Sequence, residues 1–249
     1  MEWQRVDRAP AIEDDVVDLW RIVAAEPNHD PRLPALRALL SAEERARADR
    51  FLVEEPRVIF TLARGTLRQI LGGYLGVAPT EVEFETGEHG RPFVVAPEPA
   101  GLDFNVSHSG RVILIAVARH RPIGADVEVI RTDFDHEKLA NRYFSKPEGE
   151  RLATESNAER DRSFFRCWTR KEAYLKLKGA GLTFPLDKFQ VTLLAGEEPA
   201  LVHTEIEEDD PSRFVIEDVD VDPSTMAAVM TSTPRPTLRG WELAPEAAS

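Results

Sequence analysis

Residues 122–130 read Pro-Ile-Gly-Ala-Asp-Val-Glu-Val-Ile, a run in which apolar side chains recur at every second position. That period predicts a β-strand, whose successive side chains point to opposite faces. Asp126 and Glu128 therefore share one face, and the other face carries Ile123, Ala125, Val127 and Val129. Side chains two apart on a strand start roughly 6 to 7 Å from each other. The two carboxylates can thus converge on one hard cation.

A second motif supplies a third carboxylate. Residues 168–176 read Trp-Thr-Arg-Lys-Glu-Ala-Tyr-Leu-Lys, within a helical pattern that spans residues 163–177. The apolar stripe of this helix consists of Phe164, Phe165, Trp168 and Leu175. Glu172 and Lys176 are four residues apart, so they lie together on the flank of the stripe. A carboxylate with an ammonium one turn away suits Mg²⁺ bound to a substrate diphosphate.

Each fragment alone also has an ordinary structural interpretation. Two acids on one strand face are usually just solvated, and Glu172 with Lys176 is a common helix pair that contributes roughly 0.2–0.5 kcal/mol. The two motifs together predict a magnesium site with a phosphate-binding lysine beside it. Its metal ligands would be Asp126, Glu128 and Glu172.

Composition restricts the classes of function. The 249 residues carry a formal net charge of −13, which argues against sequence-independent nucleic-acid binding, because that needs a basic surface. A polyphosphate ligand would have to be held by local basic residues and a metal. Cys167 is the only cysteine, so no internal disulfide can form. The chain has no apolar run long enough to span a bilayer and no secretory signal, so we expect a cytoplasmic protein with no membrane partner.

The order of predicted elements indicates an α+β fold. Strand patterns cover residues 16–24, 81–85, 93–95, 102–106, 112–118, 122–130, 189–194, 214–219 and 227–230, and helical patterns cover 55–74, 134–142, 146–153 and 163–177. Ser41 and Glu44 match a capping box at a helix start. We expect two similar α+β halves related by a pseudo-two-fold, residues 1–121 and 122–231, with the active site at their interface. Residues 232–249 are predicted to form a poorly ordered tail.

The connections between these elements are also predicted. A hairpin through residues 119–122 would make strands 112–118 and 122–130 neighbours in one sheet. Residues 107–110, Ser-His-Ser-Gly, are expected to form a loop after a strand, and residues 154–162 a polar loop. Gly90-Arg91-Pro92 is a turn signal. Arg47 and Arg50 could be phosphate ligands or solvated charges on a helix, and we favour the second interpretation.

Between residues 39 and 230, several motifs in order resemble the Sfp-type 4'-phosphopantetheinyl transferases. They are residues 41–51, with an acidic and arginine-rich pattern; Phe60-Thr61-Leu62-Ala63-Arg64 with Leu67-Arg68; Gly90-Arg91-Pro92; Phe104-Asn105-Val106-Ser107-His108-Ser109; Ile123-Gly124-Ala125-Asp126-Val127-Glu128; Phe144-Ser145-Lys146 with Glu148; and residues 168–176 followed by Gly179-Ala180-Gly181. The order and spacing of the motifs make the resemblance specific.

The resemblance implies a reaction and roles for the acids. In similar enzymes, 4'-phosphopantetheine passes from coenzyme A to a serine of an apo acyl or peptidyl carrier protein, and adenosine 3',5'-bisphosphate is released. The acids that match Asp126, Glu128 and Glu172 hold the Mg²⁺ that bridges the coenzyme A pyrophosphate. Glu172 would also take the proton of the attacking hydroxyl, and Lys176 would contact the pyrophosphate.

The resemblance also implies contacts with coenzyme A. Ser107 and His108 match a pair that helps to bind its 3'-phosphate. Arg57 and Arg64 match basic positions that contact its phosphates. The turn of Arg91 and Pro92 matches one that lies against the adenine.

Two alternatives come from other functional classes. One is a non-catalytic module that binds coenzyme A or a nucleotide, and the other is a Mg²⁺-dependent diphosphate hydrolase that uses the same three acids. We expect a monomer, because two halves of one chain would make a complete site. Carrier proteins are usually acidic, as this chain is, so docking should rely on apolar and local arginine contacts at the groove between the halves.

Overall fold

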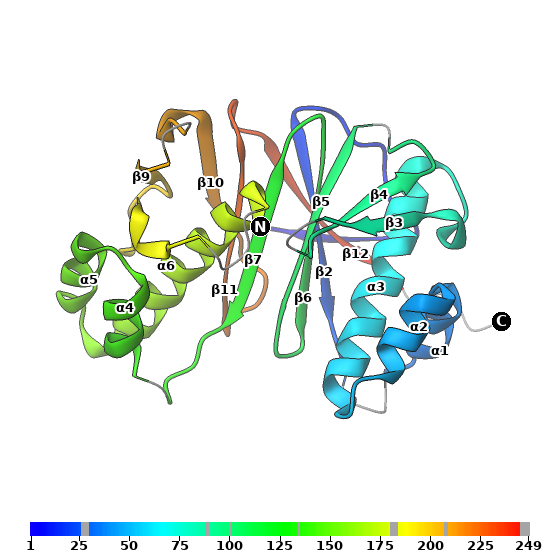
Figure 1. Ribbon diagram of the computed structural model, residues 1–249, viewed down its shortest axis with the longest axis horizontal. Coiled ribbons are helices and arrows are strands. Elements are labelled where there is room, and N and C mark those ends of the chain that lie inside the picture. The colour runs from blue at the N-terminus through cyan, green and yellow to red at the C-terminus, as the bar shows by residue number, and fades with distance from the viewer. Residues whose placement is uncertain are drawn as a thin grey trace.

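The computed structural model describes residues 1–25, 30–87, 90–99, 101–133, 135–179, 184–206 and 209–244, apart from the side chain of Ala158. Two sheets lie at the centre of the molecule, with helices α1 to α3 at one end and α4 to α6 at the other (Figure 1). Within the described part of the chain, no helix combines the length and the apolarity that crossing a membrane requires.

The N-terminal half contains a five-stranded sheet, one long helix and two short ones. Its elements are β1 (Trp3–Val6), β2 (Val16–Val23), α1 (Leu33–Leu39), α2 (Ala42–Asp49), α3 (Glu54–Leu75), β3 (Glu83–Thr86), β4 (Pro92–Ala96), β5 (Leu102–Ser109) and β6 (Val112–Arg119), with a 3-10 helix at Pro79–Glu81. The predicted capping box between Ser41 and Glu44 is confirmed at the start of α2. The long helix α3 ends at Gly76, whose φ of 69° suits glycine.

The C-terminal half follows a similar plan around a three-stranded sheet. Its elements are β7 (Ile123–Val129), α4 (His136–Tyr143), α5 (Lys146–Ala153), α6 (Asn157–Lys178), β8 (Phe189–Val191), β9 (Leu201–Thr204), β10 (Phe214–Asp218) and β11 (Thr225–Ser232), with 3-10 helices at Leu186–Lys188 and Pro211–Arg213. Both α3 and α6 have 22 residues, and each packs on the sheet of its own half. The predicted pseudo-two-fold α+β architecture is confirmed.

Three apolar cores follow from the alternation of the strands. One lies under α3 and another under α6, and the third lies between the two sheets. Ala125 and Val127 of β7 are fully buried in this third core. Because a strand alternates its side chains, Asp126 and Glu128 must then point to the other face of β7, where α6 packs.

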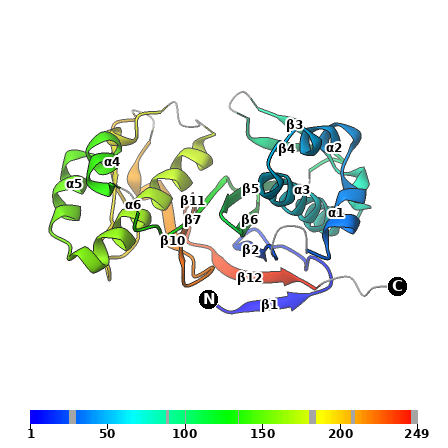
Figure 2. The ribbon, with the colours of Figure 1, turned by 90° about the horizontal axis from the view of Figure 1, so that it is seen from below.

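The predicted poorly ordered tail is wrong for residues 237–243, which form β12 (Thr237–Leu243). β12 lies between β1 and β2, runs parallel to both, and completes the N-terminal sheet (Figure 2). Trp241 explains this position, because its ring is buried in the N-terminal core and its indole N–H donates to Asp18 at 2.8 Å. The preceding proline-rich residues are only a short connection. Residues 245–249 lie outside the described residues.

The predicted pairing of β6 with β7 is also wrong. The sheet orders are β1-β12-β2-β6-β5 and β10-β11-β7. Both edges of β6 are already paired, with β2 and β5, so β7 pairs with β11 instead. The turn after β6 therefore takes the chain from one sheet to the other.

Two of the predicted loops belong to regular elements. β5 continues through Ser107 and His108 because it pairs with β6 as far as Ser109 opposite Val112. Similarly, α6 begins at Asn157, so most of the predicted loop 154–162 forms its first turns. The predicted helix start at residue 134 and the motif residues 180 and 181 lie outside the described residues.

Candidate active site

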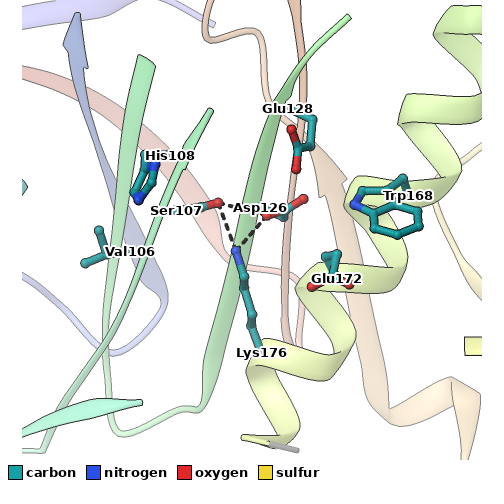
Figure 3. Close-up of a pocket in the computed structure, with 8 residues that line it drawn as sticks. All are labelled: Val106, Ser107, His108, Asp126, Glu128, Trp168, Glu172 and Lys176. Carbon is teal, nitrogen blue, oxygen red and sulfur yellow. Dashed lines mark hydrogen bonds and ion pairs between the residues drawn. The ribbon is translucent and has the colours of Figure 1, made fainter. Parts of the chain in front are cut away.

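The predicted acidic motifs meet in one cavity of about 270 Å³, here called the carboxylate cavity (Figure 3). Asp126 and Glu128 project into it from β7, and Glu172 and Lys176 approach them from α6. The structure thus brings together the carboxylates of two separate sequence motifs.

Gly124 of β7 has no side chain, which allows α6 to lie close to the strand. A Cβ atom on Gly124 would lie 2.0 Å from the carbonyl oxygen of Ala173 and 2.4 Å from the backbone nitrogen of Leu177. Any residue larger than glycine would therefore push the helix away. The close approach sets the height of Glu172 and Lys176 above the strand.

A buried ion pair anchors the other side of the same helix. Lys171 precedes Glu172, is fully buried, and lies 2.8 Å from the buried carboxylate of Glu148 in α5. Its ammonium also donates to the carbonyl oxygen of Leu186 at 2.8 Å. Breaking a buried pair by removing one partner is costly, so these contacts fix the rotation of α6 about its axis.

Lys176 and Ser107 hold the carboxylate of Asp126. Lys176 Nζ donates to Asp126 Oδ1 at 2.6 Å and to Ser107 Oγ at 2.8 Å. The Ser107 hydroxyl donates to the same Oδ1 at 2.8 Å. Burial raises the pKa of Asp126 above its usual value, although Lys176 and Ser107 act in the opposite direction.

The carboxylate of Glu128 has a similar partner in Ser109, whose hydroxyl donates to Glu128 Oε2 at 2.6 Å. Burial raises the pKa of Glu128, the bond from Ser109 opposes this rise, and the charge of Asp126 adds to it. Ser109 was not predicted as a site residue.

The third acid, Glu172, also has a raised pKa. Burial raises its pKa to about 7, and the negative charge of Asp126 adds to the rise while Lys176 opposes it. At neutral pH the group is therefore divided between its protonated and ionised forms. A pKa near the working pH suits a general base.

The arrangement fits a divalent cation. Three carboxylates face one ammonium, and Asp126 Oδ2 and Glu172 Oε1 are buried without a hydrogen-bond partner among the described residues. Carboxylate oxygens are the ligands that Mg²⁺ prefers. Within the described part of the chain, no three acidic, histidine or cysteine side chains yet converge closely enough to hold a metal ion. The ammonium of Lys176 bonds Asp126 Oδ1 instead, so a metal ion at that oxygen would have to displace it.

Two further cavities adjoin the carboxylate cavity at Val106. The basic cavity, of about 280 Å³, is lined by side chains that include Arg47, Phe51, Phe60, Arg64 and His108. The apolar cavity, of about 340 Å³, reaches from Gly90 and Pro92 to Leu175 and Gly179. Val106 lines all three, so they form one cleft. Residues of both halves line the carboxylate and apolar cavities, and residues of the N-terminal half line the basic cavity.

Of the two predicted arginines, Arg64 reaches this cleft. Its guanidinium stacks over Phe84 at 4.7 Å and lies 3.5 Å from Glu44. Arg64 Nη1 is buried without a hydrogen-bond partner among the described residues, and burial lowers the pKa of Arg64. Arg57, by contrast, is exposed, bonds to Glu54 at 3.5 Å, and is not among the residues that line the three cavities.

Arg47 lines the basic cavity, as the less favoured of its two interpretations, a phosphate ligand, would require. Its guanidinium lies 5.2 Å from the centre of the Phe60 ring. This contact joins α2 to α3, so it depends on how the two helices pack and could not be read from either one.

The Arg91 side chain joins the two halves. Its guanidinium donates to both carboxylate oxygens of Asp103 at 2.8 Å. It also donates to the carbonyl oxygens of Lys176 at 2.8 Å and Ile123 at 2.9 Å. Its charge is thus used within the protein, whereas Pro92 lines both the basic and the apolar cavities.

The predicted phosphate-binding pair is divided between the two faces of β5. Ser107 is buried and points toward Asp126, whereas His108 points away from it (Figure 3). His108 lines both the carboxylate and the basic cavities. Burial lowers the pKa of His108, and Lys176 lowers it further while Asp126 opposes the change. The imidazole is therefore neutral at neutral pH.

Known proteins are similar in sequence to this chain over most of its length. The 4'-phosphopantetheinyl transferase HetI of Nostoc sp. (strain PCC 7120 / SAG 25.82 / UTEX 2576) is 44% identical over 191 residues, which cover 76% of this chain and 79% of that protein. The chain belongs to the 4'-phosphopantetheinyl transferase superfamily. It is an enzyme that transfers phosphopantetheine to carrier proteins, as the resemblance of its motifs predicted.

Two family models and a second relative agree with this assignment. Residues 122–229 match the family model of the 4'-phosphopantetheinyl transferase superfamily, and residues 26–120 match that of the 4'-phosphopantetheinyl transferase, N-terminal. The 4'-phosphopantetheinyl transferase Sfp of Bacillus subtilis (strain 168) is 31% identical over 197 residues, 79% of this chain and 84% of that protein. Among solved structures, the holo-[acyl-carrier-protein] synthase (AcpS) of Thermotoga maritima matches 46% of this chain and 64% of its own, with 21% identity and a TM-score of 0.33.

Proposed function

We propose that this transferase takes 4'-phosphopantetheine from coenzyme A and attaches it to a serine hydroxyl of an apo acyl or peptidyl carrier protein, in a Mg²⁺-dependent reaction. The serine oxygen forms a bond to the β-phosphorus, the bond from that phosphorus to the bridging oxygen breaks, and adenosine 3',5'-bisphosphate leaves. The observation that carries the proposal is the meeting of three carboxylates and Lys176 in the carboxylate cavity.

Asp126, Glu128 and Glu172 would hold the metal. Their excess negative charge and the two unpartnered oxygens support this assignment. A Mg²⁺ held by these residues would neutralise diphosphate charge and make the phosphorus more electrophilic.

Lys176 would contact the diphosphate after its ammonium leaves Asp126 Oδ1. Its flexible side chain comes from the last turns of α6, and its charge would offset the negative charge that develops on the leaving group. Glu172 would accept the proton of the serine hydroxyl, directly or through a water molecule. Its pKa of about 7 leaves a large ionised fraction at neutral pH.

The adjoining cavities would take the rest of coenzyme A. The basic cavity offers Arg47, Arg64 and His108 to the 3'-phosphate, and the Arg64 N–H that lacks a partner supports this role. Pro92 and the turn before it would lie against the adenine. Arg57 could reach the phosphates only by leaving Glu54. For Ser107 and the guanidinium of Arg91, the bonds within the protein favour roles other than direct contact.

The proposed enzyme is a cytoplasmic monomer. Both walls of the cleft come from one chain, which supports a site that is complete without a partner copy. A single cysteine fits a reducing compartment.

The decisive experiment mixes the protein with coenzyme A, Mg²⁺ and a panel of apo carrier proteins, and follows each carrier by intact mass spectrometry. We expect at least one carrier to gain the mass of one phosphopantetheine. Release of free phosphopantetheine without any carrier gain would indicate a diphosphate hydrolase instead. Binding of coenzyme A with neither product would indicate a non-catalytic module.

A further inference from the structure

The seam between the two halves is built from side chains. β5 and β7 run in the same direction but belong to different sheets. Four backbone N–H groups of β7 donate to four side chains of β5, each 20 residues earlier in the chain. These bonds run from Ile123 to Asp103 (3.0 Å), from Ala125 to Asn105 (3.2 Å), from Val127 to Ser107 (3.3 Å) and from Val129 to Ser109 (3.1 Å).

The four bonds of this seam fall into two kinds. Ser107 and Ser109 carry hydroxyls, which can accept from a backbone N–H and donate to another group at the same time. Each uses its proton for a carboxylate of β7, Asp126 at 2.8 Å and Glu128 at 2.6 Å. The other two acceptors, on Asp103 and Asn105, lie beside Pro122 and Gly124, which have no polar side chain to hold.

Hydroxyls therefore occur in the seam where the neighbouring residue of β7 is a carboxylate. We propose that Ser107 and Ser109 are positioning residues that hold Asp126 and Glu128 in the orientation required to bind the metal, an inference that rests on the proposed function. Each serine is fixed by a backbone N–H of β7, so it holds the carboxylate rigidly relative to the same strand. Partners of this kind commonly orient metal ligands. Ser107 would then act through Asp126.

Ser109 offers the cleaner test, because Ser107 also bonds to Lys176. The variants are Ser109→Ala, which removes the hydroxyl, and Ser109→Thr, which retains it. Asn105→Ala is the matched control, because it removes a bond of the same seam that has no carboxylate partner. Each protein is titrated with Mn²⁺ and free Mn²⁺ is measured by electron paramagnetic resonance, with and without coenzyme A and without any carrier.

We expect Ser109→Ala to bind Mn²⁺ about 10- to 100-fold more weakly than the wild type, the usual effect of removing such a partner. In the absence of coenzyme A, Ser109→Thr and Asn105→Ala should bind Mn²⁺ with nearly wild-type affinity. In turnover, Ser109→Ala should raise the KM for Mg²⁺ and recover most of kcat at saturating metal. Thermal unfolding followed by circular dichroism establishes that the variants are folded.

Other results of the Mn²⁺ titrations would contradict the proposed role of Ser109 or the metal site itself. Equal Mn²⁺ affinity of Ser109→Ala and wild type would overturn the positioning role and leave the proposed transferase intact. An equally large loss in Asn105→Ala would show that the seam as a whole, and not the serine hydroxyl, supports the site. If the wild type itself binds no Mn²⁺ with or without coenzyme A, the proposed metal site fails and this inference fails with it.

Discussion

Lys176 supplies the only ammonium among the described residues that line the carboxylate cavity, and it bonds Asp126 Oδ1 at 2.6 Å. A metal ion at that oxygen would have to compete with this ammonium. We therefore expect Lys176→Met to bind Mn²⁺ about tenfold more tightly than the wild type in the absence of coenzyme A, because one hydrogen bond between charged groups is lost. The same variant should lose about 10²- to 10³-fold in kcat, because the leaving diphosphate loses its cation.

Lys178→Met is the matched control for this prediction. Lys178 lies two residues further along α6 and pairs with Asp209 at 2.9 Å, outside the three cavities. Its loss should leave metal affinity unchanged in calorimetric titrations. Weaker metal binding by Lys176→Met would mean that Lys176 supports the metal site and does not compete with it.

Glu172 should also make stability depend on pH. Its pKa is about 7 in the folded protein and 4.5 in the usual reference state. The folded protein therefore binds this proton more tightly, so stability falls as pH rises from about 4.5 to about 7 and stays lower above that. The variant Glu172→Gln should not show this decrease in stability, because glutamine does not titrate. Allowing for partial exposure, we expect it to unfold with a free energy roughly 1–3 kcal/mol higher than the wild type at pH 8 without metal.

Urea unfolding at pH 5 and pH 8 measures this difference. The gap between the two proteins should be small at pH 5 and open toward pH 8, while the variant loses transferase activity. Parallel stability curves across this pH range would contradict the assigned burial of the Glu172 carboxylate.

For single residues, the sequence spacing predicted which acids lie close together. It did not predict which residues of other elements contact them. The period of two placed Asp126 and Glu128 on one face, and the helical period placed Glu172 beside Lys176. The roles of Ser109 and Arg47 depend on contacts between different elements. Neither role could be predicted from the local sequence, because the residue pattern of one strand or helix does not show which other element packs against it.

At the scale of elements, the approach of α6 to β7 depends on Gly124. Gly124→Ala would force the two elements apart, which we expect to cost about 1–3 kcal/mol in unfolding free energy. The variant should also lose most of its activity, because Glu172 and Lys176 would move away from Asp126. Chemical unfolding and turnover, measured on the same preparation, test both effects.

Gly149→Ala provides the comparison. Gly149 lies inside α5 and a Cβ there would meet no atom within 4 Å. Alanine at this position should stabilise the helix by about 0.5–1 kcal/mol and leave turnover unchanged. Equal effects of the two substitutions would contradict the importance of the close approach at Gly124.

Element types were more predictable than element partners. The periods of the sequence located α3, α5 and most strands close to their observed bounds. The same periods could not show that β12 joins the N-terminal sheet or that β7 pairs with β11. Pairing depends on which edges are already occupied, as both edges of β6 are. That information lies in the topology and not in any local window.

At the scale of the whole molecule, net charge bears on how a carrier docks. The chain carries a formal net charge of −13, so the long-range electrostatic interaction between this protein and an acidic carrier is repulsive. Docking should therefore depend on apolar and short-range arginine contacts near the cleft. We expect the affinity for an apo carrier to change little between about 0.01 M and 1 M salt, over which the screening length falls from about 30 Å to about 3 Å. Surface plasmon resonance across this range checks it, and a steep loss of affinity with salt would indicate docking by opposite charges.

In the proposed enzyme, acids from two elements of the C-terminal half, facing β5 of the N-terminal half, form one metal site that performs phosphopantetheine transfer. The most direct test compares wild type and Glu172→Gln by intact mass spectrometry of an apo carrier incubated with coenzyme A, with Mg²⁺ or with a chelator. We expect modification of the carrier by wild type with Mg²⁺ and by neither protein with the chelator. Glu172→Gln with Mg²⁺ should be slower by about 10²-fold or more. Modification at the wild-type rate by Glu172→Gln, or by the wild type in the presence of the chelator, would contradict this expectation.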